Sequence, residues 1–409
     1  GGRPMTMQTA LDADGVLLAT IDMAGRTMNV FSAELMDALD ALMDRVDRDP
    51  AVKSCVITSG KPSFLAGADL VMVRGYCDAA RTSAHEQMFE LCGRLGRQFV
   101  RLEAADKPYV AAVNGLALGG GLELSLACRA RLVADDPRLQ LGVPEVRWGL
   151  LPGAGGTQRL PRMIGFEPAM GLLLSGRSVD PASALKLGMV SAVVPAAQLV
   201  DEAKKIARSL HGRPYDESAK FRQLAQDDVP VADASGGAAI AARFGVSAED
   251  FSLYPAYSAI VDSVLQGAHQ PLALATATEM NNFLRLMFSP VAGRMVRTLF
   301  LERLRAERVG APPSGATVEK LRYGAVPGSW EAVLANVRAP RERSDALPAG
   351  ALDVTDPTGA VHRAWLRDVA DAPLAADAPQ LVLAPLGPYG RVIEIVGAGD
   401  AEAAVFAAL

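Results

Sequence analysis

The sequence predicts an α/β protein whose first part, residues 7 to 200, contains a largely parallel β-sheet. Short apolar runs that suit buried strands alternate there with segments of helical periodicity. Half of the 409 residues are hydrophobic, which is enough for two or three domains with their own cores. The remaining residues form a helical extension, 201 to 309, and a third segment, 316 to 409.

The apolar runs define the expected strands in chain order. The first strand covers Val16 to Asp22, and a helix follows over residues 32 to 43 with Ser32 as its N-cap. The later strands are expected at residues 52–58, 109–113, 129–134 and 188–194. Because strands and helices alternate, parallel strand pairing is favoured over hairpins.

The stretch from Tyr109 to Cys128 is apolar enough to resemble a membrane-spanning helix. Asn114, Glu123 and four glycines interrupt it, however, and polar groups of this kind are costly inside a bilayer. We therefore predict a buried strand, turn and helix and no membrane span.

The chain changes character after residue 200. Residues 201 to 309 favour helices, and Pro290 is expected to break or kink the helix-rich segment 272 to 304. Residues 310 to 315 are rich in glycine and proline and predict a linker. The segment after it shows only weak α/β alternation.

Composition excludes several classes of function. The net charge of −5 and the absence of a long Lys/Arg run argue against nucleic-acid binding. The four cysteines and four histidines lack metal-ligand spacing, so no metal site is expected. Without a secretory signal, the cysteines are predicted to be reduced core thiols of a cytoplasmic protein. They are Cys55, Cys77, Cys92 and Cys128.

Two glutamates are the strongest functional signal. Glu123 follows three consecutive glycines inside an apolar helical segment, where an isolated carboxylate needs either a partner or a task. Glu145 comes 22 residues later, just before the glycine-rich turn that starts at Leu151. This spacing predicts two carboxylates at one cleft, as in an acid/base site. A capping acid and a salt-bridged acid would be the purely structural alternative.

Two glycine-flanked loops add a second signal. Gly67 precedes Ala68, and Gly119 precedes Gly120, so backbone N–H groups in both loops can point into a cleft without obstruction. We predict that the N–H groups of Ala68 and Gly120 converge on one carbonyl oxygen and stabilise an enolate or oxyanion. Glycines used only for tight turns are the alternative for either loop alone.

Taken together, these motifs resemble the crotonase (enoyl-CoA hydratase/isomerase) superfamily. They occur in the expected order over some 200 residues, which makes the resemblance specific. The motifs are Phe64–Asp69, Asn114–Gly115, Gly119–Glu123, Pro144–Glu145 and Pro152–Leu160. The resemblance implies a crotonase-like ββα spiral core, with a helical region and a partial Rossmann-like segment behind it.

The resemblance also implies roles for the site residues. Ala68 and Gly120 would bind the thioester carbonyl, Glu123 would activate water, and Glu145 would protonate the α-carbon. Since both acids are present, hydration of trans-2-enoyl-CoA to 3-hydroxyacyl-CoA is the expected lyase reaction, with the acyl-CoA as substrate and no cofactor. Isomerisation of 3-enoyl-CoA, or a CoA-binding scaffold without catalysis, are the alternatives.

Residues of the first loop are expected to bind substrate. By the resemblance, Lys61 meets the nucleotide end of CoA, although an exposed lysine without a role is the alternative. The same loop supplies the further CoA-binding candidates Phe64, Ala66, Gly67 and Asp69. Residues 70 to 100, including Met72, Tyr76, Met88 and Phe89, either line the acyl-chain pocket or are plain core.

The C-terminal part is similar to the region that joins hydratase and dehydrogenase in multifunctional β-oxidation enzymes. The near match to a dinucleotide fingerprint, Gly397 to Glu402, has Glu402 in place of the third glycine. Leu381 stands where the resemblance would put the catalytic histidine. NAD binding and dehydrogenase activity are therefore expected to be absent, through degeneration or truncation. A homo-oligomer or a thiolase partner is implied by the family alone.

Overall fold

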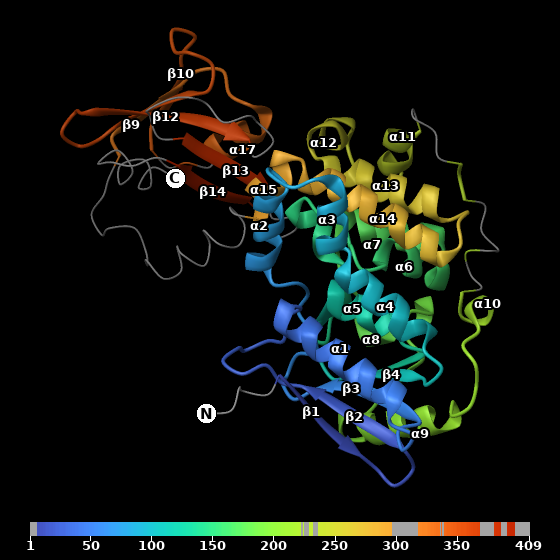
Figure 1. The fold of residues 1–409 in the computed structure, drawn as a ribbon. Helices are drawn as coiled ribbons and strands as arrows, with labels where there is room; N and C mark the ends of the chain where they lie inside the picture. The colour runs from blue at the N-terminus through green and yellow to red at the C-terminus, as the bar shows by residue number, and fades with distance from the viewer. Residues whose placement is uncertain are drawn as a thin grey trace. The chain divides into compact units, whose positions relative to one another are not determined.

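The computed structural model describes residues 6–221, 224, 229–231, 236–296, 318–335, 337, 339–368, 380–385 and 391–396. The chain forms two units, Gly1–Ala292 and Gly293–Leu409 (Figure 1).

A six-stranded sheet forms the base of the first unit, in the order β1-β2-β3-β4-β6-β8. All neighbouring strands are parallel except β1 and β2, which confirms the predicted sheet. The strands are β1 (Met7–Leu11), β2 (Val16–Ile21), β3 (Ser54–Ser59), β4 (Tyr109–Val113), β6 (Ala130–Ala134) and β8 (Ala192–Val194). A small parallel sheet of β5 (Ala117–Leu118) and β7 (Leu141–Gly142) accompanies it.

Burial explains which strands the sequence reveals. Every residue of β3, β4 and β6 is buried, as expected for parallel strands covered on both faces. Strand β1 was not predicted, because four of its five residues are exposed and it lacks an apolar pattern. The short strands β5 and β7 are below the length at which periodicity can be recognised.

Helices surround the sheet of the first unit. The N-cap prediction is confirmed, since Leu35 N donates to Ser32 Oγ (3.3 Å) at the start of the first helix. The helices up to residue 209 are α1 (Ala33–Arg48), α2 (Leu70–Ala79), α3 (His85–Cys92), α4 (Arg94–Ala104), α5 (Gly120–Ala127), η1 (Pro144–Trp148), α6 (Gly156–Ile164), α7 (Phe166–Ser175), α8 (Pro181–Leu187), η2 (Ala196–Gln198) and α9 (Leu199–Ser209).

The predicted helical extension follows. Its helices are α10 (Glu217–Lys220), α11 (Gly237–Ala242), α12 (Ala248–Leu253), α13 (Pro255–Gly267), α14 (Leu272–Met287) and α15 (Pro290–Val296). Helix α14 ends at Met287 and α15 begins at Pro290, so the proline separates two helices as predicted. Helix α14 packs against α13, α6 and α3 (Figure 1). This packing brings a late segment of the chain to the loop that precedes α6.

The stretch Tyr109 to Cys128 forms β4, β5 and α5, as predicted. Among the described residues, no helix is both long and apolar enough to cross a membrane. All four cysteines are free and buried, which confirms their prediction as core thiols.

The described part of the second unit is a mixed sheet in the order β10-β9-β11-β12-β13-β14. The pairs β9–β11, β11–β12 and β13–β14 are antiparallel, and β9–β10 and β12–β13 are parallel. The elements are β9 (Lys320–Tyr323), α17 (Gly328–Ala335), β10 (Arg341–Arg343), β11 (Ala351–Thr355), β12 (Val361–Asp368), β13 (Gln380–Pro385) and β14 (Arg391–Val396).

A buried tryptophan organises the core of this second unit. Trp330 on α17 is fully buried, and its Nε1 donates to Arg367 O (2.8 Å) on β12. Leu321, Leu352 and Leu366 pack around it from the sheet. The predicted linker 310–315 and the fingerprint segment 397–402 lie outside the described residues, and the assignment of 316–409 to a dehydrogenase-like segment stays a prediction.

Candidate active site

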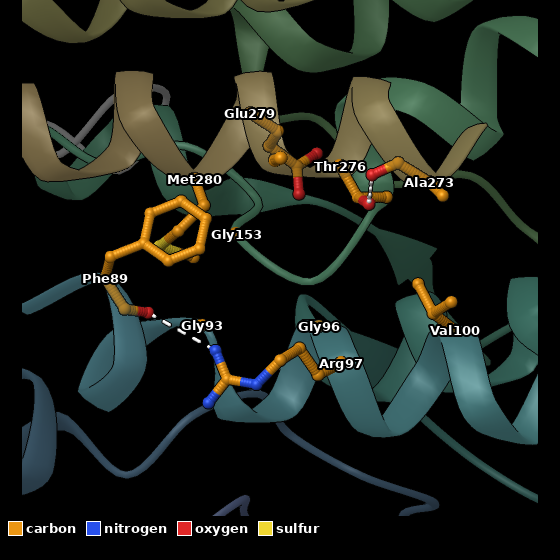
Figure 2. A pocket seen from close by; sticks show the side chains of 11 residues that line it. Phe89, Gly93, Gly96, Arg97, Val100, Gly153, Ala273, Thr276, Glu279 and Met280 are labelled. Carbon is orange, nitrogen blue, oxygen red and sulfur yellow. Dashed lines mark hydrogen bonds between the residues drawn. The ribbon is translucent and has the colours of Figure 1, made fainter. Parts of the chain in front are cut away.

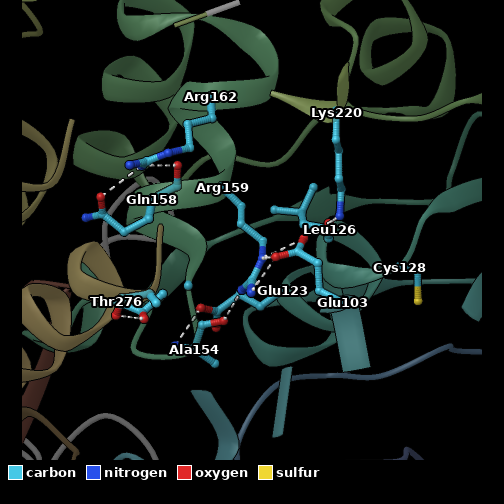
Figure 3. Close-up of polar contacts among 12 residues, drawn as sticks. Glu103, Glu123, Leu126, Cys128, Ala154, Gln158, Arg159, Arg162, Lys220 and Thr276 are labelled. Atoms are coloured by element: carbon cyan, nitrogen blue, oxygen red, sulfur yellow. Dashed lines mark hydrogen bonds and ion pairs between the residues drawn. The ribbon is translucent and has the colours of Figure 1, made fainter. Parts of the chain in front are cut away.

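Glu123 lies on α5, a helix in which all eight residues are buried. Its Oε2 accepts two hydrogen bonds, from Ala154 N (2.7 Å) and Gly156 N (2.8 Å). Both donors belong to the glycine-rich turn that the sequence placed after Glu145 (Figure 3). Both bonds fall on Oε2, and no hydrogen bond to Oε1 is seen among the described residues.

Glu145 lies on the short helix η1 and reaches back toward the glycine turn before α5. A Cβ atom on Gly119 would lie only 2.4 Å from Glu145 Oε1, and Gly119 has a positive φ of 54°. Only glycine satisfies both conditions. Glu145 Oε2 is buried and has no hydrogen-bond partner among the described residues. A buried oxygen of this kind is suited to a ligand or a transferable proton.

The pKa values of both carboxyl groups are raised by the protein. Burial raises the pKa of Glu123 to about 7, against the opposing effects of the Gly156 and Ala154 amides and Arg159. Burial raises the pKa of Glu145 well above its usual range, and the charge of Glu123 raises it further. A pKa near neutrality suits Glu123 to act as a base, and the raised pKa of Glu145 favours its protonated form.

An ion cluster lies behind Glu123 (Figure 3). The fully buried Arg159 pairs with Glu103 (3.1 Å) and donates to Ala154 O (3.2 Å). Lys220 pairs with Glu103 from the other side. This cluster fixes the loop at Ala154 and supplies the positive charge nearest to Glu123.

The two predicted amide donors lie on neighbouring loops. Leu118 N donates to Leu65 O (3.0 Å), and a Cβ on Gly119 would lie 3.6 Å from Gly67 Cα. Gly120 is the first residue of α5, so its N–H has no intrahelical acceptor. The N–H of Ala68 points away from Phe31, which bonds to the residues on either side of Ala68. Both donors are thus available to a carbonyl oxygen.

The substrate-binding candidates of the first loop have different environments. Lys61 Nζ pairs with Asp22 Oδ1 (2.8 Å) and donates to Arg26 O (2.8 Å). The side chain of Phe64 is fully buried in the core. Asp69 caps α2 by accepting from Val71 N (3.0 Å). The roles of these residues in CoA binding stay predictions.

The other two candidates, Ala66 and Gly67, contribute their backbone. Ala66 N donates to Asn29 O (2.9 Å), and Gly67 O accepts from Phe31 N (2.8 Å). Gly67 has a φ of 100°, which allows the sharp turn before Ala68. These bonds fix the loop that carries the Ala68 donor.

A third buried glutamate was missed by the sequence analysis. Glu279 on α14 is 1% exposed, and its carboxylate accepts from Gly155 N (2.7 Å) and Thr157 N (3.0 Å). It is the sole acid of α14, a helix with many buried apolar residues. That isolation is the same signal that revealed Glu123.

A cavity of about 220 Å³ lies between α3, α4 and α14 (Figure 2). Its lining is mostly apolar or small, with Glu279 and Arg97 as charged members. The lining residues are Phe89, Gly93, Gly96, Arg97, Val100, Gly153, Ala273, Thr276, Ala277, Glu279 and Met280. Gly153 places the cavity beside the loop that holds Glu123.

We expect the free energy of unfolding to fall as the pH rises from about 5 to about 7. Above that pH the lowered pKa of Lys220, about 7, acts in the opposite sense. The folded state raises the pKa of Glu123 to about 7 and that of Glu279 to about 8, above the ordinary 4.5. The folded state therefore binds more protons than the unfolded state in this window, and stability is lost as they dissociate. Urea unfolding across the window tests this. The slope should flatten in Glu279→Gln, and a rise in stability with pH would contradict it.

An α/β core in which a buried and a half-buried glutamate lie near two glycine-flanked backbone amides is suited to acid–base chemistry. A family model described as enoyl-CoA hydratase/isomerase matches residues 14–242. The chain therefore belongs to the enoyl-CoA hydratase/isomerase family. It is thus a hydratase or isomerase type of enzyme, as the sequence predicted.

Related proteins agree with this family. The chain is 35% identical over 332 residues to a fatty acid oxidation complex subunit alpha of Shewanella sp. (strain MR-4), covering 77% of this chain and 43% of the relative. A subunit of the same name from Shewanella frigidimarina is 34% identical over 320 residues, covering 78% and 43%. The chain thus spans about two fifths of the length of these curated relatives.

Solved structures support the fold. Human mitochondrial delta3-delta2-enoyl-CoA isomerase has a TM-score of 0.51 and 21% identity, covering 75% of this chain and all of that one. Enoyl-CoA hydratase from Bacillus halodurans has the same score and identity, covering 72% and 99%. At 21% identity these similarities show the fold alone, and they confirm the predicted crotonase-like α/β fold.

Proposed function

We propose that this protein hydrates trans-2-enoyl-CoA to 3-hydroxyacyl-CoA, with Glu123 as base and Glu145 as acid. The observation that carries the proposal is the pair Glu123 and Glu145, whose carboxyl pKa values are both raised by burial, near two backbone N–H groups that have no acceptor among the described residues. The names of the relatives, subunits of a fatty acid oxidation complex, support a role in β-oxidation.

The reaction needs only groups of this chain and water. The N–H groups of Ala68 and Gly120 bind the thioester oxygen, which makes the β-carbon electrophilic. Glu123 takes a proton from water as the water oxygen bonds to the β-carbon. The π electrons move to the enolate, and Glu145 donates its proton to the α-carbon. Transfer of the proton on Glu123 to Glu145 then restores both groups.

The cavity beside Gly153 is the candidate site for the acyl chain. Five of the eleven lining residues are glycine or alanine and leave room for methylene groups, and Met280 and Phe89 supply apolar surface. Gly153 directly precedes Ala154, which donates to Glu123, so an occupant of the cavity lies close to the reacting atoms. We therefore infer that the enzyme accepts acyl chains longer than crotonyl.

The dehydrogenase step is proposed to be absent from these residues. A dinucleotide-binding sheet of the Rossmann type is mostly parallel, whereas three of the five strand pairs described in the second unit are antiparallel. Glu402 in the only near-fingerprint supports the same proposal. Assembly into a complex is proposed from the relatives' names. A homo-oligomer or a thiolase partner rests on the family resemblance alone, and a cytoplasmic location stays a prediction.

The experiment is an assay of the purified protein with crotonyl-CoA and with a longer trans-2-enoyl-CoA. We expect 3-hydroxyacyl-CoA to form from both and to accumulate, with no NADH when NAD⁺ is present. Turnover of a 3-enoyl-CoA alone would favour the isomerase. Binding of CoA thioesters without turnover would overturn the enzymatic proposal in favour of a scaffold.

A further inference from the structure

Four consecutive backbone N–H groups at the start of α6 are divided between two buried glutamates. They belong to Ala154, Gly155, Gly156 and Thr157. The first and third donate to Glu123, whereas the second and fourth donate to Glu279. The two carboxylates come from α5 and α14, so helices far apart in the sequence hold one loop in common.

Glu279 is unusual for a residue that only packs a helix. It is 1% exposed, and burial of a carboxylate costs several kcal/mol unless its oxygens are hydrogen-bonded. Three donors meet this need, since the hydroxyl of Thr157 donates to Oε2 in addition to the two amides. An apolar side chain would pack α14 against α6 without this cost. The carboxylate therefore calls for a role at the loop.

We propose that Glu279 is a positioning residue of the hydratase reaction. By holding Gly155 and Thr157, it keeps the intervening peptide groups oriented so that Ala154 and Gly156 donate to Glu123. Glu123 is thereby fixed with Oε1 toward the attacking water. The inference rests on the proposed hydratase function and adds a residue from the helical extension to its site.

Glu279 is surrounded by other charges of the site. The ionisable groups that face it are carboxyl groups on α5 and η1 and guanidinium groups on α6 and α4. They are Glu123, Glu145, Arg159, Arg162 and Arg97. Burial, and then the charge of Glu123, raise the pKa of Glu279 to about 8. Near pH 7 Glu279 is therefore largely protonated, and its main effect on Glu123 there is through the loop.

Two substitutions test the positioning role in the full chain. Glu279→Ala removes both anchors of the loop, and we expect kcat for hydration to fall about 100-fold with little change in KM. Glu279→Gln keeps a carbonyl oxygen for Gly155 N and should recover part of the rate. The acid limb of the kcat/KM profile should move to higher pH in Glu279→Ala, because Glu123 loses donors that favour its charged form.

A matched control comes from the same helix. Asn282 on α14 is also buried, and it bonds to Gln266 and to Thr278 O, away from the loop. Asn282→Ala should lower the Tm but leave kcat per folded molecule and the pH profile unchanged.

The outcomes separate the two proposals. Wild-type protein without hydratase activity would overturn the proposed function and this inference together. Active wild type, with Glu279 variants that lose thermal stability like Asn282→Ala but keep kcat and the pH profile, would overturn the inference alone. A lower kcat, a shifted acid limb and partial recovery by glutamine would establish it.

Discussion

Glutamine in place of Glu123 or Glu145 is expected to lower kcat for hydration of crotonyl-CoA by about 100- to 10,000-fold. Glutamine keeps the shape of each side chain but can neither take a proton from water nor give one to the α-carbon. The KM should change little, because neither carboxyl group is needed to hold CoA.

The two variants should differ in their pH dependence. Wild-type kcat/KM should fall below about pH 7, where Glu123 becomes protonated. This acid limb should disappear in the residual activity of Glu123→Gln and persist in that of Glu145→Gln. Steady-state rates from pH 5 to 9 measure the pH profiles of both variants. This range extends about two pH units on either side of the Glu123 pKa of about 7.

The exposed Glu249 on α12 provides the control for these variants. Glu249→Gln should match wild type in rate and pH profile. Full activity of either site variant would show that the corresponding carboxyl group transfers no proton in the reaction.

The second large loss of kcat is expected when the N–H of Ala68 is removed. Ala68→Pro deletes one N–H, and the loss of one donor to an oxyanion typically lowers kcat about 100- to 1000-fold. The bridge to Phe31 should survive, because it uses Gly67 O and Asp69 N rather than the Ala68 amide. Single-turnover hydration of crotonyl-CoA measures the chemical step directly.

Ala33→Pro is the matched control for this substitution. Ala33 is the exposed first residue of α1, a position where proline replaces an amide without an intrahelical acceptor. It should leave the rate unchanged. If Ala68→Pro folds and retains the wild-type rate, the Ala68 N–H does not bind the developing oxyanion.

The predictable parts of the fold are those with an apolar pattern. Strand β4 has the bounds expected from the sequence, and Ser32 caps α1 as expected, because burial and capping are local signals. Strand β1 could not be recognised, since its stability comes from pairing with β2 rather than from burial of its own residues.

The site shows the same limit. Glu123 and Glu145 stand beside glycines that signal close backbone approach, so sequence alone could suggest them as a pair. Glu279 lies 156 positions after Glu123, within the helical extension, whose packing against α6 has no sequence signature. Its hydrogen bond from Thr157 N depends on the packing of α14 against α6, which only the structure shows.

The loop of residues 154–157, which Glu123 and Glu279 hold together, indicates where the catalytic unit of this enzyme ends. The family model ends at residue 242, yet two of the four loop amides find their acceptor at Glu279, 37 residues later. A minimal enzyme designed from that match would lack Glu279, so these two amides would lose their acceptor. We therefore expect the catalytic unit to extend beyond α14. Chimaeras made from relatives should exchange the loop of residues 154–157 together with α14.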